Sequence, residues 1–420
     1  MSSVIVHYQE LALKGRNRPW FVRLLVRNIR EVLSDLDVRS VEALMGRIQV
    51  VTGEDIAEAV IVERLSRVFG VANFAFARQT PTDLDSMAEA ASAELDDLSP
   101  RSFRVLAKRA DKRYALTSPE IERELGGRIR RRYGWPVDLS HADLVVRVEI
   151  IPGTAFVFAR RHAGAGGLPV GASGRVACLM SGGIDSPVAA CRMMKRGCRV
   201  RLIHFHSYPI VSTASQDKAR ELAEVLTRYQ LHSRLLLVPF GDVQRRVIVE
   251  VPPPFRVVAY RRLMVRIAER LARTSGARAL VTGEAVGQVA SQTLENLTVT
   301  DAAATMTILR PLVGMDKSEI TAEAQRLGTY PISIGPDEDC CQLFTPPHPA
   351  TKVRLQQIEA VESRLPIAEL VERAVAETVV EDYHFPASTS RRRSGAGGTA
   401  RGGTGEPAPV EPAPTPRPAG

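Results

Sequence analysis

The chain has 420 residues, of which 45% are hydrophobic, and its 56 basic residues outnumber its 47 acidic residues by nine. At about 100–200 residues per domain, this length predicts two to four domains, each large enough to bury a core. The basic excess suits a polyanionic partner, although a net charge of this size does not by itself require one.

The sequence also excludes membrane proteins and disulfide-rich proteins. No stretch approaches the ~20 apolar residues that a membrane-spanning helix needs, and residues 1–10 lack the basic start of a secretory signal. Five cysteines are too few, and an odd number, for a disulfide framework. They include no Cys-x-x-Cys pair, which argues against a zinc ribbon. We therefore expect a cytoplasmic protein with no membrane partner and no structural metal.

The first part of the chain, up to residue 163, alternates short strands with short helices. The apolar periodicity predicts strands at 4–8, 48–51, 73–78, 103–108, 145–151 and 155–160. Helices are expected at 21–33, 56–69, 83–95 and 119–132. This pattern predicts two small α+β units, 1–54 and 55–163, followed by a glycine-rich linker at 164–174.

From residue 175 to 352 the pattern changes to apolar strands that alternate with longer helices. Strands are expected at 176–179, 200–206, 235–238 and 279–282, and helices from 187, at 214–229 and at 256–272. Such alternation predicts an α/β domain with a doubly wound parallel sheet, in which ligands bind at the carboxyl ends of the strands. Residues 353–385 are expected to be helical, and 386–420, rich in Pro, Gly and Ala, to form a disordered tail.

The strongest local signal is the run Ser-Gly-Gly-Ile-Asp-Ser at 181–186, which follows an apolar strand and precedes Pro187. Its glycines let the backbone turn tightly, and a helix that begins here presents its N-terminus to an anion. The serine hydroxyls can donate to phosphate oxygens, and Asp185 is suited to bind Mg²⁺ or orient the phosphates. An ordinary strand-to-helix turn could use the same residues. The absence of any Gly-Lys pair excludes a Walker loop.

This loop resembles the pyrophosphate loop of the ATP pyrophosphatase superfamily, whose members activate a carbonyl or carboxylate by adenylation. Further segments resemble one family of this superfamily, the tRNA 4-thiouridine synthetases (tRNA sulfurtransferase, ThiI). These segments are 8–17, 103–120, 140–144, 166–190, 281–297 and 311–317. The resemblance implies a ferredoxin-like domain at 1–54, an RNA-binding THUMP domain at 55–163 and an adenine nucleotide α-hydrolase-like domain at 175–352.

The same resemblance implies an enzyme that uses ATP and Mg²⁺ to make 4-thiouridine at position 8 of tRNA. In such a reaction uridine O4 is adenylated and a cysteine persulfide then attacks C4. The ATP-binding residues that it implies are Leu179, Met180, Ser181, Gly182, Gly183, Asp185, Ser186, His204, Phe205, Arg261, Gly283 and Gln292. Asp185 and Lys317 match positions that the family needs for catalysis. From the residues alone, Lys317 is better explained as the start of a helix.

Sulfur transfer requires an accessible, deprotonated sulfur. Cys178, Cys191 and Cys198 lie on or beside expected core elements and are interpreted as packed thiols. The family places its essential cysteine where this chain has Cys340 and Cys341. The register of the following Pro and Thr residues favours Cys341, with Cys340 as the alternative.

Many family members end in a rhodanese domain, which this sequence has no room for, so we expect a separate cysteine desulfurase to supply the persulfide. In the family, the rhodanese domain is largely responsible for sulfur transfer to the thiamine-thiazole sulfur carrier protein. For this chain we therefore expect that second role less strongly than tRNA thiolation. A homodimer is expected from the resemblance alone.

Residues 101–134 contain eleven basic and four acidic residues. A charge run of this kind is often a solvated helix face, but the match to the THUMP domain favours binding of tRNA phosphates. The expected tRNA-binding residues are Arg104, Lys108, Arg109, Lys112, Arg113, Arg130, Arg131 and Arg132.

Two alternatives to a 4-thiouridine synthetase remain. One is another tRNA-adenylating pyrophosphatase, such as a 2-thiouridylase or a lysidine synthetase, which the leading THUMP-like region argues against. The other is a tRNA-binding protein whose catalysis has lapsed, against which Asp185, Lys317 and the cysteine pair argue.

Overall fold

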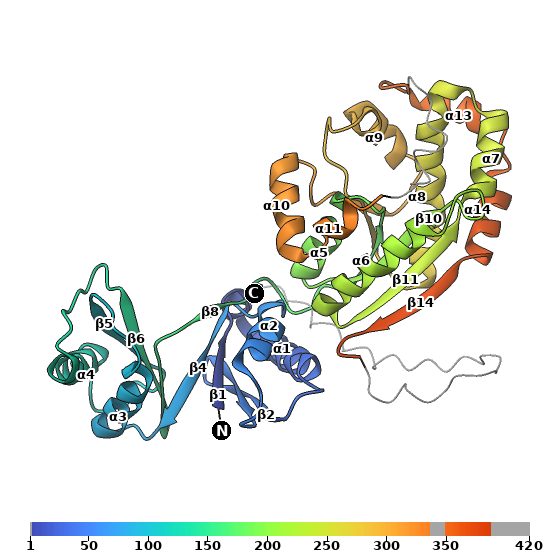
Figure 1. Ribbon diagram of the computed structural model, residues 1–420. Helices are drawn as coiled ribbons and strands as arrows, with labels where there is room; N and C mark the ends of the chain where they lie inside the picture. The colour runs from blue at the N-terminus through green and yellow to red at the C-terminus, as the bar shows by residue number, and fades with distance from the viewer. Residues whose placement is uncertain (1, 337–348, 388–420) are drawn as a thin grey trace, which may run out of the picture. The chain divides into compact units, whose positions relative to one another are not determined.

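The computed structural model describes residues 2–336 and 349–387, which divide into two compact units that meet in sequence at Pro169 and Val170 (Figure 1). Each unit contains its own sheet. No helix of the described residues is long and apolar enough to cross a membrane.

The N-terminal unit is built on one continuous eight-stranded sheet. Its order is β2 (Val38–Leu44), β3 (Arg47–Thr52), β1 (Ser2–His7), β4 (Asn73–Thr80), β7 (Thr154–Phe158), β6 (Leu144–Ile151) and β5 (Phe103–Arg109), with β8 (His162–Ala163) paired to β4. Strand β4 joins the two halves, because residues 73–77 pair with β1 while residues 78–80 pair with β7.

Four helices belong to this sheet, namely α1 (Arg18–Val32), α2 (Glu58–Ser66), α3 (Leu84–Leu95) and α4 (Ser118–Tyr133). The apolar sides of α3 and α4 bury Met87, Leu95, Ile121 and Leu125 against β5, β6 and β7. A left-handed Gly153, with φ of +79°, closes the β6–β7 hairpin. The four helices and six strands expected here are confirmed, and β2 and β8 were missed.

The C-terminal unit contains the expected parallel sheet. Its six strands lie in the order β13 (Thr307–Leu309), β12 (Ala279–Val281), β9 (Arg175–Leu179), β10 (Arg199–His206), β11 (His232–Pro239) and β14 (Val379–His384). The first five are parallel. From β9 the chain builds outward through β10 and β11, then returns to place β12 and β13 on the other side of β9. The strand order therefore reverses beside β9, where doubly wound sheets bind ligands.

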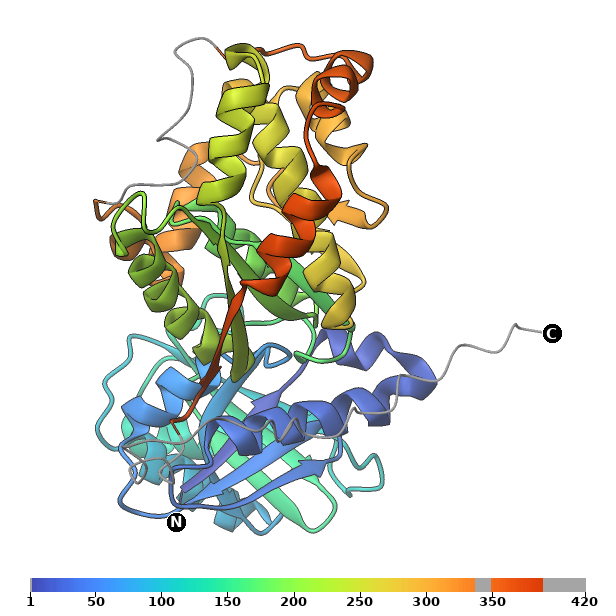
Figure 2. The same ribbon diagram turned by 90° about the vertical axis from the view of Figure 1, so that its right-hand side faces the viewer.

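Helices cover both faces of this sheet (Figures 1 and 2). On one side pack α5 (Asp185–Lys195), α6 (Ala214–Gln230) and α10 (Lys317–Leu327). On the other side pack α7 (Gly241–Glu250), α8 (Arg256–Thr274), α13 (Leu355–Glu362) and α14 (Ile367–Ala376). The shorter helices α9 (Leu294–Asp301) and α11 (Tyr330–Ser333) lie in the connections after β12 and α10.

The segment expected to be helical after residue 353 is only partly so. Residues 379–384 form β14, which pairs antiparallel with β11 from Val379–Leu237 to His384–His232. The free edge of β11 offers unpaired backbone groups, and the β-branched Val379 and Val380 suit an edge strand better than a helix. The helical expectation for 379–384 was therefore wrong.

Candidate active site

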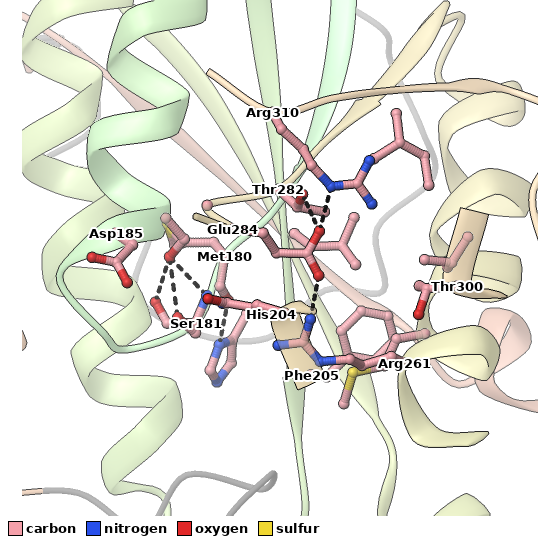
Figure 3. Close-up of a pocket in the computed structure, with 17 residues that line it drawn as sticks. Met180, Ser181, Asp185, His204, Phe205, Arg261, Thr282, Glu284, Thr300 and Arg310 are labelled. Carbon is pink, nitrogen blue, oxygen red and sulfur yellow. Dashed lines mark hydrogen bonds and ion pairs between the residues drawn. The ribbon is translucent and has the colours of Figure 1, made fainter. Parts of the chain in front are cut away.

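The serine-glycine loop at 181–184 joins the end of β9 to the start of α5. The backbone N–H of Ser181 donates to Oγ of Ser186 at 2.9 Å, and that hydroxyl donates back to the carbonyl of Ser181 at 3.1 Å. The N–H of Gly183 donates to Oγ of Ser181 at 3.2 Å. These bonds fix the turn that presents the N-terminus of α5, with its positive dipole end, to an anionic ligand (Figure 3).

A cavity of about 180 Å³ opens at the carboxyl ends of four parallel strands, next to this loop. Of the expected ATP-binding residues, the structure places ten in its wall, namely Leu179, Met180, Ser181, Asp185, Ser186, His204, Phe205, Arg261, Gly283 and Gln292. Gly182 and Gly183 lie in the loop itself and do not line the cavity. The prediction missed the other lining residues, which are Met264, Val265, Thr282, Glu284, Thr300, Ile308 and Arg310.

Two of the expected residues shape the cavity through protein contacts. A Cβ on Gly283 would lie 2.8 Å from the backbone nitrogen of Ser186, so only glycine lets the chain after β12 approach the start of α5 this closely. Nδ1 of His204 lies 2.9 Å from the carbonyl oxygen of Met180, which ties the ends of β10 and β9 together.

A buried charge network forms one wall of the cavity (Figure 3). Glu284 is 6% exposed and forms ion pairs with both Arg261 and Arg310. It also accepts a hydrogen bond from Thr282 at 2.8 Å. Burial alone would lower the pKa of Arg310, but its hydrogen bonds to Asp301 and the charge of Glu284 raise it above its usual value. The ion pair with Glu284 also sets the position of the Arg261 guanidinium group in the cavity wall.

Asp185 and Lys317 meet at the mouth of the loop. Nζ of Lys317 donates to Oδ1 of Asp185 at 2.6 Å, and the amide of Gln288 donates to Oδ2 at 2.9 Å. Lys317 is also the first residue of α10, which Asp316 caps by accepting from the N–H groups of Ser318 and Glu319. The prediction that Lys317 starts a helix is therefore confirmed, and this helix start brings its ammonium group to the loop.

The cysteines separate into two sets. Cys178, Cys191 and Cys198 are buried, as expected, and burial raises the pKa of the Cys178 and Cys191 thiols to about 12. Burial also raises the pKa of Cys198. None of the three supplies a thiolate at neutral pH. Cys340 and Cys341 lie outside the described residues.

The expected tRNA-binding residues differ in how freely they face solvent. Lys108, Lys112 and the last-turn residues of α4, Arg130 and Arg131, are exposed. Arg113 and Arg132 are exposed too, but they pair with Asp111 and Asp96.

Two other expected tRNA-binding residues, Arg104 and Arg109, donate hydrogen bonds to backbone carbonyls. Arg109 donates to the carbonyls of Tyr114 and Leu116, at 3.1 and 2.8 Å, and Arg104 donates to that of Leu139 at 2.8 Å. Their guanidinium groups stabilise local structure.

A second cavity, of about 640 Å³, lies in the N-terminal unit and is lined by Arg47, Lys108, Arg147 and Arg161. Beneath them Glu149, which is 5% exposed, pairs with Arg47 at 2.6 Å and with His7 at 3.0 Å. Burial alone would raise the pKa of Glu149, but the hydrogen bond and charge of His7 and the charge of Arg47 lower it. Only Lys108 of this set was expected, because the others come from strands and a loop far apart in sequence.

Three family models match the chain. The ThiI ferredoxin-like domain matches residues 3–75, the THUMP domain 81–160, and the Thiamine biosynthesis protein (ThiI) model 171–367. A probable tRNA sulfurtransferase of Thermus thermophilus is 50% identical over 382 residues, which are 90% of this chain and 93% of that protein. One of Moorella thermoacetica is 44% identical over 371 residues, 88% of this chain and 95% of that protein.

A solved structure is similar across both units. It is a crystal structure of a 4-thiouridine synthetase–RNA complex with bound ATP, with a TM-score of 0.83 and 36% identity, covering 91% of this chain and 99% of that one. A structure of PH1313 from Pyrococcus horikoshii has a TM-score of 0.61 and 26% identity, covering 78% of this chain and 100% of that one. The three family models and the identity to these relatives show that this chain belongs to the tRNA sulfurtransferase (ThiI) family.

Proposed function

We propose that the protein is an ATP-dependent tRNA sulfurtransferase that makes 4-thiouridine at position 8 of tRNA. The observation that supports this most directly is the cavity at the strand-order reversal, with Asp185, Lys317 and the N-terminus of α5 at one end. The names of the relatives and the ATP and RNA in the similar complex point to the same chemistry.

The first step is adenylation of the uridine. O4 attacks the α-phosphorus of ATP, the bond to the bridging oxygen breaks, pyrophosphate leaves, and the N3 proton is lost. Charge accumulates on the departing pyrophosphate, where Lys317 and the N–H groups at the start of α5 stabilise it. The apolar wall of Met180, Phe205 and Met264 accepts the adenine.

Mg²⁺ is proposed as the counter-ion of the triphosphate. The described residues contain no cluster of three or more His, Cys, Asp or Glu side chains that could hold a metal ion. Mg²⁺ commonly uses one or two carboxylates, with phosphate oxygens and water completing its shell. Asp185 fits this pattern, because each of its oxygens can accept one more partner besides Lys317 or Gln288.

The second step replaces oxygen by sulfur. A persulfide on Cys341 or Cys340 attacks C4 of the adenylated uridine, the C4–O bond breaks, and AMP leaves. A second thiol then attacks the cysteine sulfur of the new C4–S–S link, which releases 4-thiouridine and leaves a disulfide. We propose that a separate cysteine desulfurase supplies the persulfide, since the buried thiols of Cys178, Cys191 and Cys198 are poor sulfur carriers.

For the tRNA, we propose that the basic cavity and the exposed end of α4 bind phosphates. Lys108 lines that cavity, and Arg130 and Arg131 are exposed at the end of α4. Arg104 and Arg109 keep a supporting role, because their guanidinium groups bond backbone carbonyls.

The test is thiolation of unmodified tRNA by the full chain with ATP, Mg²⁺, cysteine and a cysteine desulfurase. Product is read as 4-thiouridine absorbance for wild type, Cys340→Ser and Cys341→Ser, with Cys198→Ser as the matched control. Loss in one of the first two variants would identify the sulfur carrier. Wild-type protein that forms neither 4-thiouridine nor AMP with tRNA would refute the proposal.

A further inference from the structure

Three loops of the C-terminal unit converge on the carboxylate of Asp185. They follow β9, β12 and β13, which are neighbours in the sheet and parallel, so the three loops leave the same edge. The first loop leads into Asp185, the second carries Gln288, and the third leads to Lys317. The second and third loops are also joined directly, because the N–H of Val286 donates to the carbonyl of Val313 at 3.2 Å.

A defined backbone turn presents Gln288 to the start of α5. Its own N–H donates to the carbonyl of Ala285 at 3.4 Å, and the N–H of Gly287 donates to the carbonyl of Gln292 at 3.0 Å. These bonds fold the loop after β12 back on itself. Gln292 lines the ATP cavity, so the same turn serves the nucleotide site and the contact with Asp185.

The amide of Gln288 and the ammonium group of Lys317 bind different oxygens of Asp185. Nε2 of Gln288 lies 2.9 Å from Oδ2, and Nζ of Lys317 lies 2.6 Å from Oδ1. A carboxylate held by one oxygen still turns about its Cβ–Cγ bond, because the energy profile of this torsion is broad. The side chain of Lys317 is 50% exposed, and an exposed ion pair alone fixes geometry poorly. The bond from Gln288 therefore fixes the plane of the carboxylate.

An amide suits this position better than a charged group would. An ionised carboxylate only accepts hydrogen bonds, so its partner must be a donor. A second cation beside Asp185 would compete with the Mg²⁺ that Asp185 is proposed to bind, and another carboxylate would repel it. Glutamine donates a hydrogen bond and leaves the negative charge of Asp185 available.

We propose that Gln288 is a positioning residue for adenylation, which acts through Asp185 by holding its carboxylate in the orientation that the reaction requires. The inference rests on the proposed two-step function and deepens its first step. A carboxylate that can turn still carries its charge, so loss of Gln288 should slow the reaction much more than it weakens ATP binding.

The test is a double-mutant cycle of Gln288→Leu and Asp185→Asn in the full chain. Leucine is similar in size to glutamine and removes the donor. Gln356→Leu, at an exposed position of α13, is the matched control. Three quantities are measured for each protein. They are the single-turnover rate of tRNA-dependent pyrophosphate release with Mg²⁺ and no sulfur source, the dissociation constant of ATP from equilibrium dialysis without tRNA, and the thermal midpoint.

We expect Gln288→Leu to lower the rate by roughly tenfold or more, while the dissociation constant of ATP changes less than about threefold and the thermal midpoint is unchanged. In the Asp185→Asn background the same change should lower the rate by less than about twofold, because no carboxylate remains to be oriented. Gln356→Leu should match wild type in all three quantities.

A wild-type rate in Gln288→Leu would overturn the proposal. Losses that multiply in the double variant would overturn it too, since Gln288 would then act independently of Asp185. A lower thermal midpoint with equally weakened ATP binding would show a merely structural role of the loop, and would likewise overturn it. Wild-type protein that releases no pyrophosphate with tRNA would instead refute the proposed two-step function.

Discussion

Nζ of Lys317 lies 2.6 Å from Oδ1 of Asp185, so two residues 132 positions apart meet at the start of α5. Asp185 is the first residue of α5 and Lys317 the first of α10, so two helix N-termini converge on one place. Such an arrangement concentrates positive potential, and the carboxylate of Asp185 keeps the ammonium group in position within it.

Replacing either member of this pair should slow adenylation strongly. We expect Lys317→Met and Asp185→Asn each to lower tRNA-dependent pyrophosphate release by roughly 100-fold or more, because a preorganised charge is lost where the transition state needs it. The binding constant for ATP should change far less than the rate. Lys352→Met, at an exposed lysine of the same unit, is the control. Retained single-turnover rates in Lys317→Met would contradict the assignment.

Glu284→Gln tests the buried charge network of the cavity. The change leaves Arg261 and Arg310 without their shared carboxylate, and breaking a buried ion pair of this kind costs about 3 kcal/mol of unfolding free energy. Urea unfolding should show this loss, and ATP should bind more weakly because Arg261 is no longer fixed. Glu359→Gln, at an exposed position of α13, should leave both quantities unchanged. Unaltered ATP binding in Glu284→Gln would show that the position of Arg261 does not contribute to ATP binding.

The sequence could predict the parallel sheet and its loop because both depend on local patterns. Apolar runs such as 176–179 predict buried strands, and Ser-Gly-Gly before Pro187 predicts a turn into a helix. The resemblance singled out Asp185 and Lys317, which no local pattern could, but the contact between them is found only in the structure.

Other features depend on contacts that form only in the folded chain. Glu284 follows Gly283 in a matched segment, but its partner Arg310 comes from the end of β13. The partners Arg47 and Glu149 come from β3 and β6. Strand β14 forms because it pairs with the free edge of β11, and the residues of β14 alone do not reveal that partner. For the same reason, the sequence could not show that Arg109 donates to backbone carbonyls, and it was therefore predicted to contact tRNA phosphates.

The stability of the N-terminal unit should depend on pH through Glu149. Its pKa is lower in the folded protein than the usual 4.5, so its contribution is present above about pH 4.5 and is lost as the pH falls through the folded value. Glu149→Gln should lower the unfolding free energy at pH 7 by about 3 kcal/mol, since Arg47 stays buried without its partner.

Thermal unfolding of both proteins from pH 7 to pH 3 measures this effect. The stability difference between wild type and Glu149→Gln should shrink as the solution is acidified below pH 4.5. Glu42→Gln, at an exposed residue of β2, serves as the control and should track wild type. A difference that stays constant down to pH 3 would contradict the role of the charge.

The positive surface of the N-terminal unit should appear in the salt dependence of tRNA binding. Arg130→Ala and Arg131→Ala remove exposed charges at the end of α4, and each lost phosphate contact lowers the steepness of log K against log salt by about one.

Arg109→Ala should leave this slope unchanged and lower stability instead, because its guanidinium group donates to the carbonyls of Tyr114 and Leu116. Arg364→Ala, on an exposed position of the other unit, is the matched control. Slopes measured by filter binding between 50 and 300 mM salt, roughly the range over which counterion release dominates, decide the question. If the Arg130 and Arg131 variants retain the wild-type slope, the end of α4 does not contact tRNA phosphates.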